Sequence, residues 1–326
     1  MNTLLDIQNL SVAFDTDDGP LHAAEDVSFS IGHGEVVGLV GESGCGKSVT
    51  ALSLLRLIPI PPGRILSGKV LFEGRDLLHL PTPELQTIRG RRISVIFQEP
   101  QAALSPLHTV GAQLIETLQL HLVLDHQAAK NIALDWLKKT GIPDPEERMR
   151  AYPYQLSGGM LQRVMIAMAL MLEPSLIIAD EPTTALDVTI QAQILDLLLE
   201  MKSRDTSLLI ITHDLGVVWE MCDRILVMYA AKIVEEGPRD KIFTTPAHPY
   251  TQALLESAIS LTSRSERLSS IEGQVPSPLS YPAGCRFADR CKFIFPRCRQ
   301  ELPPLYDVAP DHHSACFLCD PQRGRN

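Results

Sequence analysis

The spacing of apolar residues along the chain predicts strands and helices that alternate. Between Leu4 and Phe14 apolar residues fall at almost every second position, which is typical of a strand with one buried face. The run Glu35–Val40 is almost continuously apolar, as expected of a strand buried on both faces, and after a glycine-rich turn a helical pattern extends to Ile58. Further short strands are predicted at 27–31, 69–72, 93–97, 176–179 and 208–211.

A mostly helical segment from about 104 to 172 separates two groups of predicted strands. Its pattern is broken at 141–145 and at Pro153. Later elements are predicted as a helix at 189–202, a hairpin at 224–235 and two short helices around Ile242 and Leu254. This alternation is typical of an α/β fold with a parallel sheet, here interrupted by a helical insert.

The character of the sequence changes after Ser257, which predicts a domain boundary. Residues 1–257 carry the periodic pattern, whereas 258–326 begin with a Ser- and Arg-rich stretch and continue rich in proline and cysteine. We therefore expect an α/β domain followed by a small Cys-rich C-terminal extension.

Composition and charge narrow the class of protein. Of 326 residues 45% are hydrophobic, which is enough for an ordinary globular core. The net charge of −10 argues against a nucleic-acid binder or a protein adsorbed on anionic lipid. No apolar run approaches the roughly 18 residues that cross a bilayer, and the N-terminus does not resemble a secretory signal. We expect a cytoplasmic chain that meets a membrane only through a protein partner.

The segment Gly41–Ser48 matches the phosphate-loop pattern G-x-x-x-x-G-K-[ST] at every required position. Its glycines allow backbone N–H groups to surround phosphate oxygens, Lys47 would reach the β- and γ-phosphates, and Ser48 would coordinate Mg²⁺. A chance glycine turn is a poor alternative, because the motif joins a buried strand to a helix. Cys45 could be a reactive thiol, but a small loop filler is favoured. The predicted nucleotide contacts are Gly41, Glu42, Ser43, Gly44, Cys45, Gly46, Lys47, Ser48 and Val49.

A second candidate site is the acidic pair Asp180-Glu181 at the end of the predicted strand 176–179. An apolar strand that ends in an acid is the usual setting of a Mg²⁺-binding aspartate, so Asp180 is predicted as that ligand. Glu181 would then polarise the attacking water as a general base. The alternative is that Asp180 and Glu181 are two acids in a solvated turn. The phosphate loop upstream argues against this alternative.

With the stretch Leu156–Arg163, LSGGMLQR, these motifs resemble the nucleotide-binding subunit of an ATP-binding-cassette (ABC) transporter. The motifs follow one another as phosphate loop, Gln98, LSGG signature, Asp180-Glu181, Ala185-Leu186-Asp187 and His213. The resemblance covers residues 4–257. It implies a phosphate-loop ATPase core with an antiparallel β subdomain and a helical subdomain at about 100–170.

The resemblance also implies that two cassettes pair head to tail, with each ATP between one phosphate loop and the partner's signature. Ser157, Gly158 and Gly159 would face the γ-phosphate, although LSGG alone could equally be an ordinary helix N-cap. The implied catalytic residues are Glu181, His213, Gln98 and Lys47, and the implied Mg²⁺ ligands are Ser48, Gln98 and Asp180.

Several of these residues have plainer interpretations outside the family. Gln98 could be a polar loop residue, His213 a structural histidine, and Asp187, which would bridge the two subunits, another N-cap. Phe14 stands where the family stacks an aromatic ring on adenine, but it also ends an apolar strand and could belong to the core.

The C-terminal part narrows the resemblance. This part resembles the ATP-binding subunits of importers of dipeptides, oligopeptides and nickel. The resemblance is carried by HPYTQALL at 248–255 and by GCRFADRC, FPRC and SAC after it. Together with YPYQLSGGM and ADEPTTALDVTIQAQI it is most similar to the dipeptide/oligopeptide branch.

Four cysteines of the extension follow the pattern C-x5-C-x6-C-x17-C, namely Cys285, Cys291, Cys298 and Cys316. Zinc sites favour closer pairs, whereas four thiolates at wider spacing can hold an iron–sulfur cluster, and the resemblance implies a [4Fe–4S] cluster here. Zinc, or a thiol-rich fold without metal, are the alternatives. Cys319 is a further candidate ligand, while His312 and His313 are expected in a solvated loop.

The expected function is an ATPase subunit that energises peptide import, peripheral at the cytoplasmic face of the inner membrane. Its expected partners are two transmembrane permease subunits, a solute-binding protein and a related ATPase chain, a heterodimer being favoured over a homodimer. No nucleic-acid partner is expected. The alternatives are an importer of nickel or another small solute, a soluble cassette ATPase, and a redox protein regulated by ATP.

Overall fold

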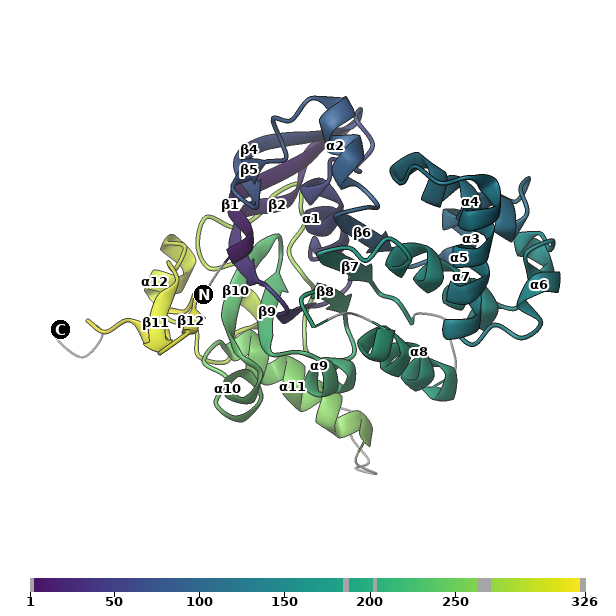
Figure 1. The fold of residues 1–326 in the computed structure, drawn as a ribbon. Helices are drawn as coiled ribbons and strands as arrows, with labels where there is room; N and C mark the ends of the chain where they lie inside the picture. The colour runs from purple at the N-terminus through teal and green to yellow at the C-terminus, as the bar shows by residue number, and fades with distance from the viewer. Residues whose placement is uncertain (1–2, 184–187, 202–203, 263–270, 323–326) are drawn as a thin grey trace.

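The computed structural model describes residues 3–183, 188–201, 204–262 and 271–322. Two sheets form the centre, a helical arm projects on one side and the C-terminal extension lies on the opposite side (Figure 1). Within the described residues no helix is both long enough and apolar enough to span a bilayer.

The first sheet is antiparallel, with strand order β2-β1-β4-β5. Its strands are β1 (Thr3–Thr16), β2 (Gly19–Gly32), β4 (Gly63–Phe72) and β5 (Arg75–Asp76). β1 confirms the predicted first strand, but β2 and β4 begin earlier than the sequence pattern indicated. Their first residues are mostly exposed or half-buried, so they lack the apolar alternation that marks a strand.

The second sheet has eight strands in the order β11-β12-β10-β9-β3-β8-β7-β6. Five of them are mutually parallel: β3 (Val36–Val40), β6 (Ile93–Ile96), β7 (Leu176–Asp180), β8 (Ser207–Thr212) and β9 (Arg224–Tyr229). Every residue of β3 is buried, which confirms the prediction for this strand, and every residue of β7 and β8 is buried as well. Because the strands are parallel, their carboxyl ends meet at one edge of the sheet.

Two apolar cores lie on the two faces of this sheet. Along β3, Val36 and Val40 belong to one core, whereas Val37 and Leu39 belong to the other. The second core also fills the space below the antiparallel sheet, around α1 (Lys47–Leu54). Strand β3, which carries the phosphate loop, is thus held from both sides.

The helical insert is confirmed as an arm that packs around α7. Its helices are α3 (Pro100–Ala103), α4 (Val110–His121), α5 (His126–Lys139), α6 (Pro145–Arg148), η1 (Pro153–Gln155) and α7 (Gly158–Leu170). Thr109 and Asp125 cap α4 and α5 with side-chain oxygens, which satisfies N–H groups of the first turns. The predicted break near residue 141 is a glycine with φ of +71° after α5.

Four of the remaining helices flank the second sheet: α8 (Val188–Met201), α9 (Leu215–Met221), α10 (Arg239–Thr244) and α11 (Pro249–Thr262). The helix α2 (Thr82–Ile88) lies beside the antiparallel sheet and contributes Leu85 and Ile88 to the second core (Figure 1). α11 has 14 residues and contains the predicted boundary after Ser257.

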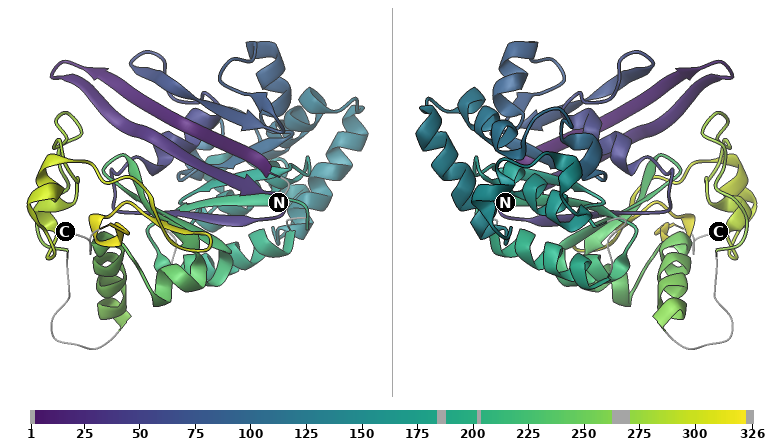
Figure 2. Two further views of the ribbon diagram at one scale, coloured as in Figure 1. Left: turned by 90° about the vertical axis from the view of Figure 1, so that its left-hand side faces the viewer. Right: turned by 90° about the vertical axis from the view of Figure 1, so that its right-hand side faces the viewer.

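The extension is more regular than its sequence suggested. β11 (Tyr306–Ala309) and β12 (His312–Ser314) continue the second sheet, because β12 pairs with β10 (Lys232–Pro238). The short helices η2 (Ala288–Arg290), α12 (Pro296–Gln300) and η3 (Phe317–Cys319) complete it. The expectation of a solvated loop at residues 312 and 313 is therefore wrong, since both lie in a strand and His312 is buried against Glu235. Figure 2 shows this part beside the end of the sheet.

Candidate nucleotide-binding site

The phosphate loop turns sharply between β3 and α1, and its glycines are required by the surrounding backbone. Gly41 and Gly46 have φ of +155° and +107°. A Cβ atom at Gly41 would lie 2.1 Å from the carbonyl oxygen of Met228, and one at Gly46 would lie 2.0 Å from that of Ala23. The loop can therefore follow this path only with glycine at both positions.

Lys47 lies across the loop that precedes it. Its Nζ donates hydrogen bonds to the carbonyl oxygens of Gly41 at 2.8 Å and Glu42 at 3.1 Å, and the residue is buried. These contacts hold the ammonium group at the loop, where an anionic phosphate would meet it together with the backbone N–H groups.

Cys45 belongs to this loop, and its side chain is buried. Burial raises the pKa of its thiol above the ordinary value, which disfavours the reactive thiolate. These observations fit the interpretation of Cys45 as a loop filler.

Ser48 and Asp180 form a pair of oxygen groups suited to Mg²⁺. The Ser48 hydroxyl donates to Oδ1 of Asp180 at 2.9 Å. Asp180 ends β7 and is buried, which raises the pKa of its carboxyl above the ordinary value. Magnesium prefers such hard oxygen ligands, so these residues fit the ion that the sequence predicted.

Glu181 lies at the centre of a polar group made by the ends of three strands. Its Oε2 accepts a hydrogen bond from Nε2 of Gln98 at 3.1 Å, and its Oε1 lies 3.4 Å from Nδ1 of His213. Glu181 itself has φ of +44°, and its backbone N–H donates to the carbonyl of Ile211. The structure thus brings together three of the four residues predicted as catalytic, Gln98, Glu181 and His213, at the ends of β6, β7 and β8, while their roles stay predictions.

The signature residues lie at the start of α7. Ser157 is the N-cap of this helix and accepts from the N–H of Met160, which agrees with the plainer interpretation of LSGG. Ser157 and Gly158 are nevertheless exposed, and a Cβ at Gly158 would meet no atom within 4 Å. Gln162, one turn along, donates to the carbonyl of Pro182, so the helix is tied to the segment after Glu181.

The other predicted site residues have different environments. Ser43 and Gly44 are exposed on the loop, and Val49 packs against the second core. Phe14 is half-buried against the same core, so stacking on adenine stays a prediction. Asp187 lies outside the described residues.

One contact of the phosphate loop had no signal in the sequence. The carboxylate of Glu42 pairs with both terminal nitrogens of Arg290 from the extension, at 2.7 and 3.0 Å. The two residues are 248 positions apart, and neither belongs to a motif that would have linked them.

The four predicted cysteine ligands line one small cavity between α12, η3 and the start of α11. Phe287, Phe293, Phe295 and Phe317 also line it. Within the described residues, however, no three His, Cys, Asp or Glu side chains stand close enough together to hold a metal ion. Cys319 does not line this cavity, and its Sγ faces the carbonyl of Ala247.

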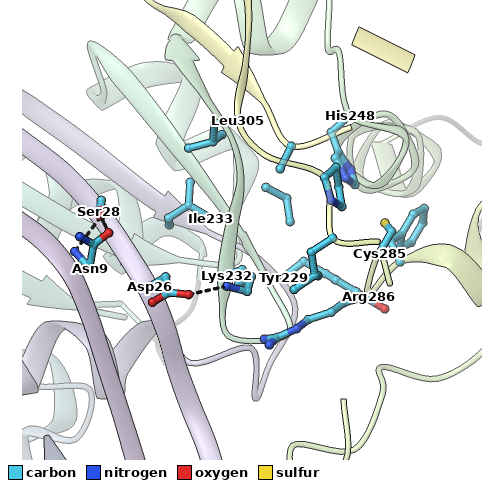
Figure 3. Close-up of a pocket in the computed structure, with 15 residues that line it drawn as sticks. Asn9, Asp26, Ser28, Tyr229, Lys232, Ile233, His248, Cys285, Arg286 and Leu305 are labelled. Atoms are coloured by element: carbon cyan, nitrogen blue, oxygen red, sulfur yellow. Dashed lines mark hydrogen bonds and ion pairs between the residues drawn. The ribbon is translucent and has the colours of Figure 1, made fainter. Parts of the chain in front are cut away.

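A larger cavity, of about 250 Å³, lies between the extension, β2 and β10 (Figure 3). Arg286 extends along it beside Tyr229, and Lys232 is paired with Asp26 on its other side. Cys285 lines both this cavity and the cysteine cavity.

Comparison with known proteins places these features in context. Residues 24–184 match the family described as ABC transporter, and residues 234–298 match the family described as oligopeptide/dipeptide transporter, C-terminal region. The chain is 46% identical to the dipeptide transport ATP-binding protein DppD of Escherichia coli, over 99% of this chain and 98% of that protein. It is also 46% identical to the oligopeptide transport ATP-binding protein OppD of Bacillus subtilis, over 98% of this chain and 89% of that protein.

Among solved structures, a dimeric bacterial ABC transporter cassette is similar, with a TM-score of 0.64 and 27% identity. The similarity covers 72% of this chain and 98% of the cassette.

Proposed function

The chain belongs to the ATP-binding subunits of ABC transporters, and from this membership we propose that it hydrolyses ATP to energise the import of dipeptides or oligopeptides. The observation that carries the cargo assignment is the similarity of nearly the whole chain, extension included, to relatives named for dipeptide and oligopeptide transport. A nickel importer or a soluble cassette ATPase has no comparable support.

The geometry of the site indicates how the chain's residues would act on ATP. Lys47 and the N–H groups of the loop would balance the charge of the phosphates, which is the main requirement of phosphoryl transfer. Ser48 and Asp180 would hold Mg²⁺, which neutralises charge that develops on the phosphate oxygens.

Glu181 would receive a proton from the attacking water, and its contacts with Gln98 and His213 would orient its carboxylate. The water oxygen would bond to the γ-phosphorus as the bond from that phosphorus to the bridging oxygen of ADP breaks. The products are ADP and inorganic phosphate.

We further propose that the active form contains two ATPase chains. Ser157 and Gly158 are exposed at the N-terminus of α7, where N–H groups and the helix dipole favour an anion. A second chain would present these residues to the ATP bound at the phosphate loop. The partner chain is proposed to be a related ATPase, and the pair would dock on two permease subunits at the cytoplasmic face of the inner membrane, supplied by a solute-binding protein.

The proposed transport function is tested by reconstituting the chain with its permeases and partner ATPase in liposomes. ATP should drive uptake of a labelled dipeptide presented with the binding protein, and the variant Glu181→Gln should abolish this uptake. Uptake of ⁶³Ni²⁺ without dipeptide uptake would replace the cargo assignment. ATP hydrolysis without uptake of either solute would contradict the role in import.

For the extension we propose a [4Fe–4S] cluster held by Cys285, Cys291, Cys298 and Cys316. Support comes from their position around one cavity with an aromatic wall. The described residues hold no group of three such side chains close enough together for a metal ion. The proposal therefore rests on the shared cavity and on the wide spacing of the four cysteines along the chain, which is compatible with a four-iron cluster.

The cluster would act as a structural crosslink between the segment 285–298 and residue 316. Analysis of anaerobically purified protein should find about four iron and four sulfide per chain, the composition of the cube. Stoichiometric zinc, or protein without metal, would contradict the assignment. The alternative of a redox protein is tested by truncating the chain after residue 260. If the extension had only a redox role, the truncated chain would hydrolyse ATP at the rate of the full-length chain.

A further inference from the structure

Arg290 of the extension is among the most fully bonded side chains of the molecule. It ends η2, and only 4% of its side chain is exposed. Its guanidinium makes five hydrogen bonds, to both carboxylate oxygens of Glu42, to the hydroxyl of Tyr229 and to the backbone carbonyls of Ile271 and Glu272. Since a guanidinium has five N–H groups, this environment matches arginine completely.

The other polar groups of Glu42 are also engaged. Its backbone N–H donates to the hydroxyl of Tyr250 at 2.9 Å, and its carbonyl accepts from Nζ of Lys47 at 3.1 Å. The rings of Tyr229 and Tyr250 pack against each other, with centroids 4.5 Å apart. A continuous series of contacts therefore runs from Arg290 through Glu42 to the lysine of the phosphate loop.

Because Glu42 is negatively charged, its pairing with Arg290 affects the binding of ATP. A carboxylate in the phosphate loop would repel the polyanionic phosphates of ATP, and the bidentate pair with Arg290 balances that charge. Removal of the guanidinium would leave a partly buried carboxylate without its partner, so that the loop would either move or carry an excess negative charge.

We propose that Arg290 is a positioning residue through which the extension holds the phosphate loop and balances its charge for ATP. The inference rests on the proposed function and adds a role for the extension in nucleotide affinity. Arg286 supplies an independent anchor, because its guanidinium donates to the carbonyl of Ala230 and to Glu25. The loss of Arg290 alone should therefore leave the extension attached.

The test compares Arg290→Gln with wild type as purified full-length chains. Affinity for a fluorescent ATP analogue is measured in EDTA, so that hydrolysis does not contribute. We expect the Kd of Arg290→Gln to rise at least about tenfold, because an unbalanced negative charge a few ångström from the phosphates repels them by an energy of that order. Arg299→Gln is the matched control, since Arg299 lies in the same extension in an exposed pair with Asp289, and its Kd should not change.

The double variant Glu42→Gln/Arg290→Gln separates charge balance from general damage. Removing both charges should restore much of the affinity that Arg290→Gln loses, and Arg290→Lys should show an intermediate Kd. An unchanged Kd in folded Arg290→Gln, or a double variant that binds no better than the single one, would overturn the inference. If wild type itself bound no ATP in EDTA or in Mg²⁺, the proposed function would fail instead.

Discussion

The hydroxyl of Ser48 donates a 2.9 Å hydrogen bond to the carboxylate of Asp180, although 132 positions separate the two residues. The contact forms because β3 and β7 are parallel strands of one sheet, each adjacent to β8, so their carboxyl ends lie at the same edge. It places a buried carboxyl where a divalent cation is expected. Without a cation that arrangement is costly, because burial disfavours the charged form.

The first prediction concerns the stability of Asp180→Asn without Mg²⁺ and nucleotide. The pKa of Asp180 is raised by burial in the folded state, with a further contribution from Glu181. The folded chain thus binds this proton more tightly than the unfolded chain, and its free energy of unfolding falls as pH rises through the interval between the two pKa values. Urea unfolding at pH 7 should show Asp180→Asn to be more stable than wild type, by a margin that shrinks on acidification.

Asp196→Asn is the control for this measurement, because Asp196 is exposed on α8. It should change the free energy of unfolding little at either pH. The prediction fails if Asp180→Asn is less stable than wild type at neutral pH. The same substitution should abolish Mg²⁺-dependent ATP hydrolysis, so stability and function would change in opposite directions.

The second prediction concerns Glu181→Gln. The amide keeps the shape of the side chain and a hydrogen-bonding group toward Gln98, but it cannot take a proton from water. ATP turnover should fall at least about a hundredfold, as loss of a general base commonly causes, while the affinity for ATP is retained. Size-exclusion chromatography should then detect an ATP-dependent dimer. Turnover close to wild type would show that another group acts as the base.

The parts of the site that could be predicted from sequence are those whose chemistry is local. The phosphate loop places its glycines and Lys47 within eight positions, and the strand before Asp180 is recognisable by its apolar run. The contacts of Arg290 with Glu42 could not be predicted, since an ion pair between distant residues leaves no pattern in either segment. Strand β11 was missed for another reason: its four residues are exposed or half-buried, so it shows no alternation.

The third prediction concerns which cysteine completes the cluster. Cys316 lines the cavity shared with the other three cysteines, whereas Cys319 faces a backbone carbonyl outside it. Cys316→Ser should therefore lower the iron content of the purified protein, and Cys319→Ser should leave it near wild type. Iron and sulfide analysis measures both. Loss of iron in Cys319→Ser alone would assign the fourth ligand to Cys319.

The last prediction compares two glycines of the phosphate loop. Both have positive φ, +107° at Gly46 and +78° at Gly44, so alanine at either position incurs a backbone cost of roughly 1–2 kcal/mol. A Cβ at Gly44 meets no atom within 4 Å, whereas one at Gly46 would lie 2.0 Å from the carbonyl oxygen of Ala23. Gly46→Ala must therefore displace the loop from β2, and its free energy of unfolding should fall by clearly more than that of Gly44→Ala in urea titrations. Equal losses would mean that the backbone of β2 yields easily, and that the position of the loop is set by Lys47 and its hydrogen bonds instead.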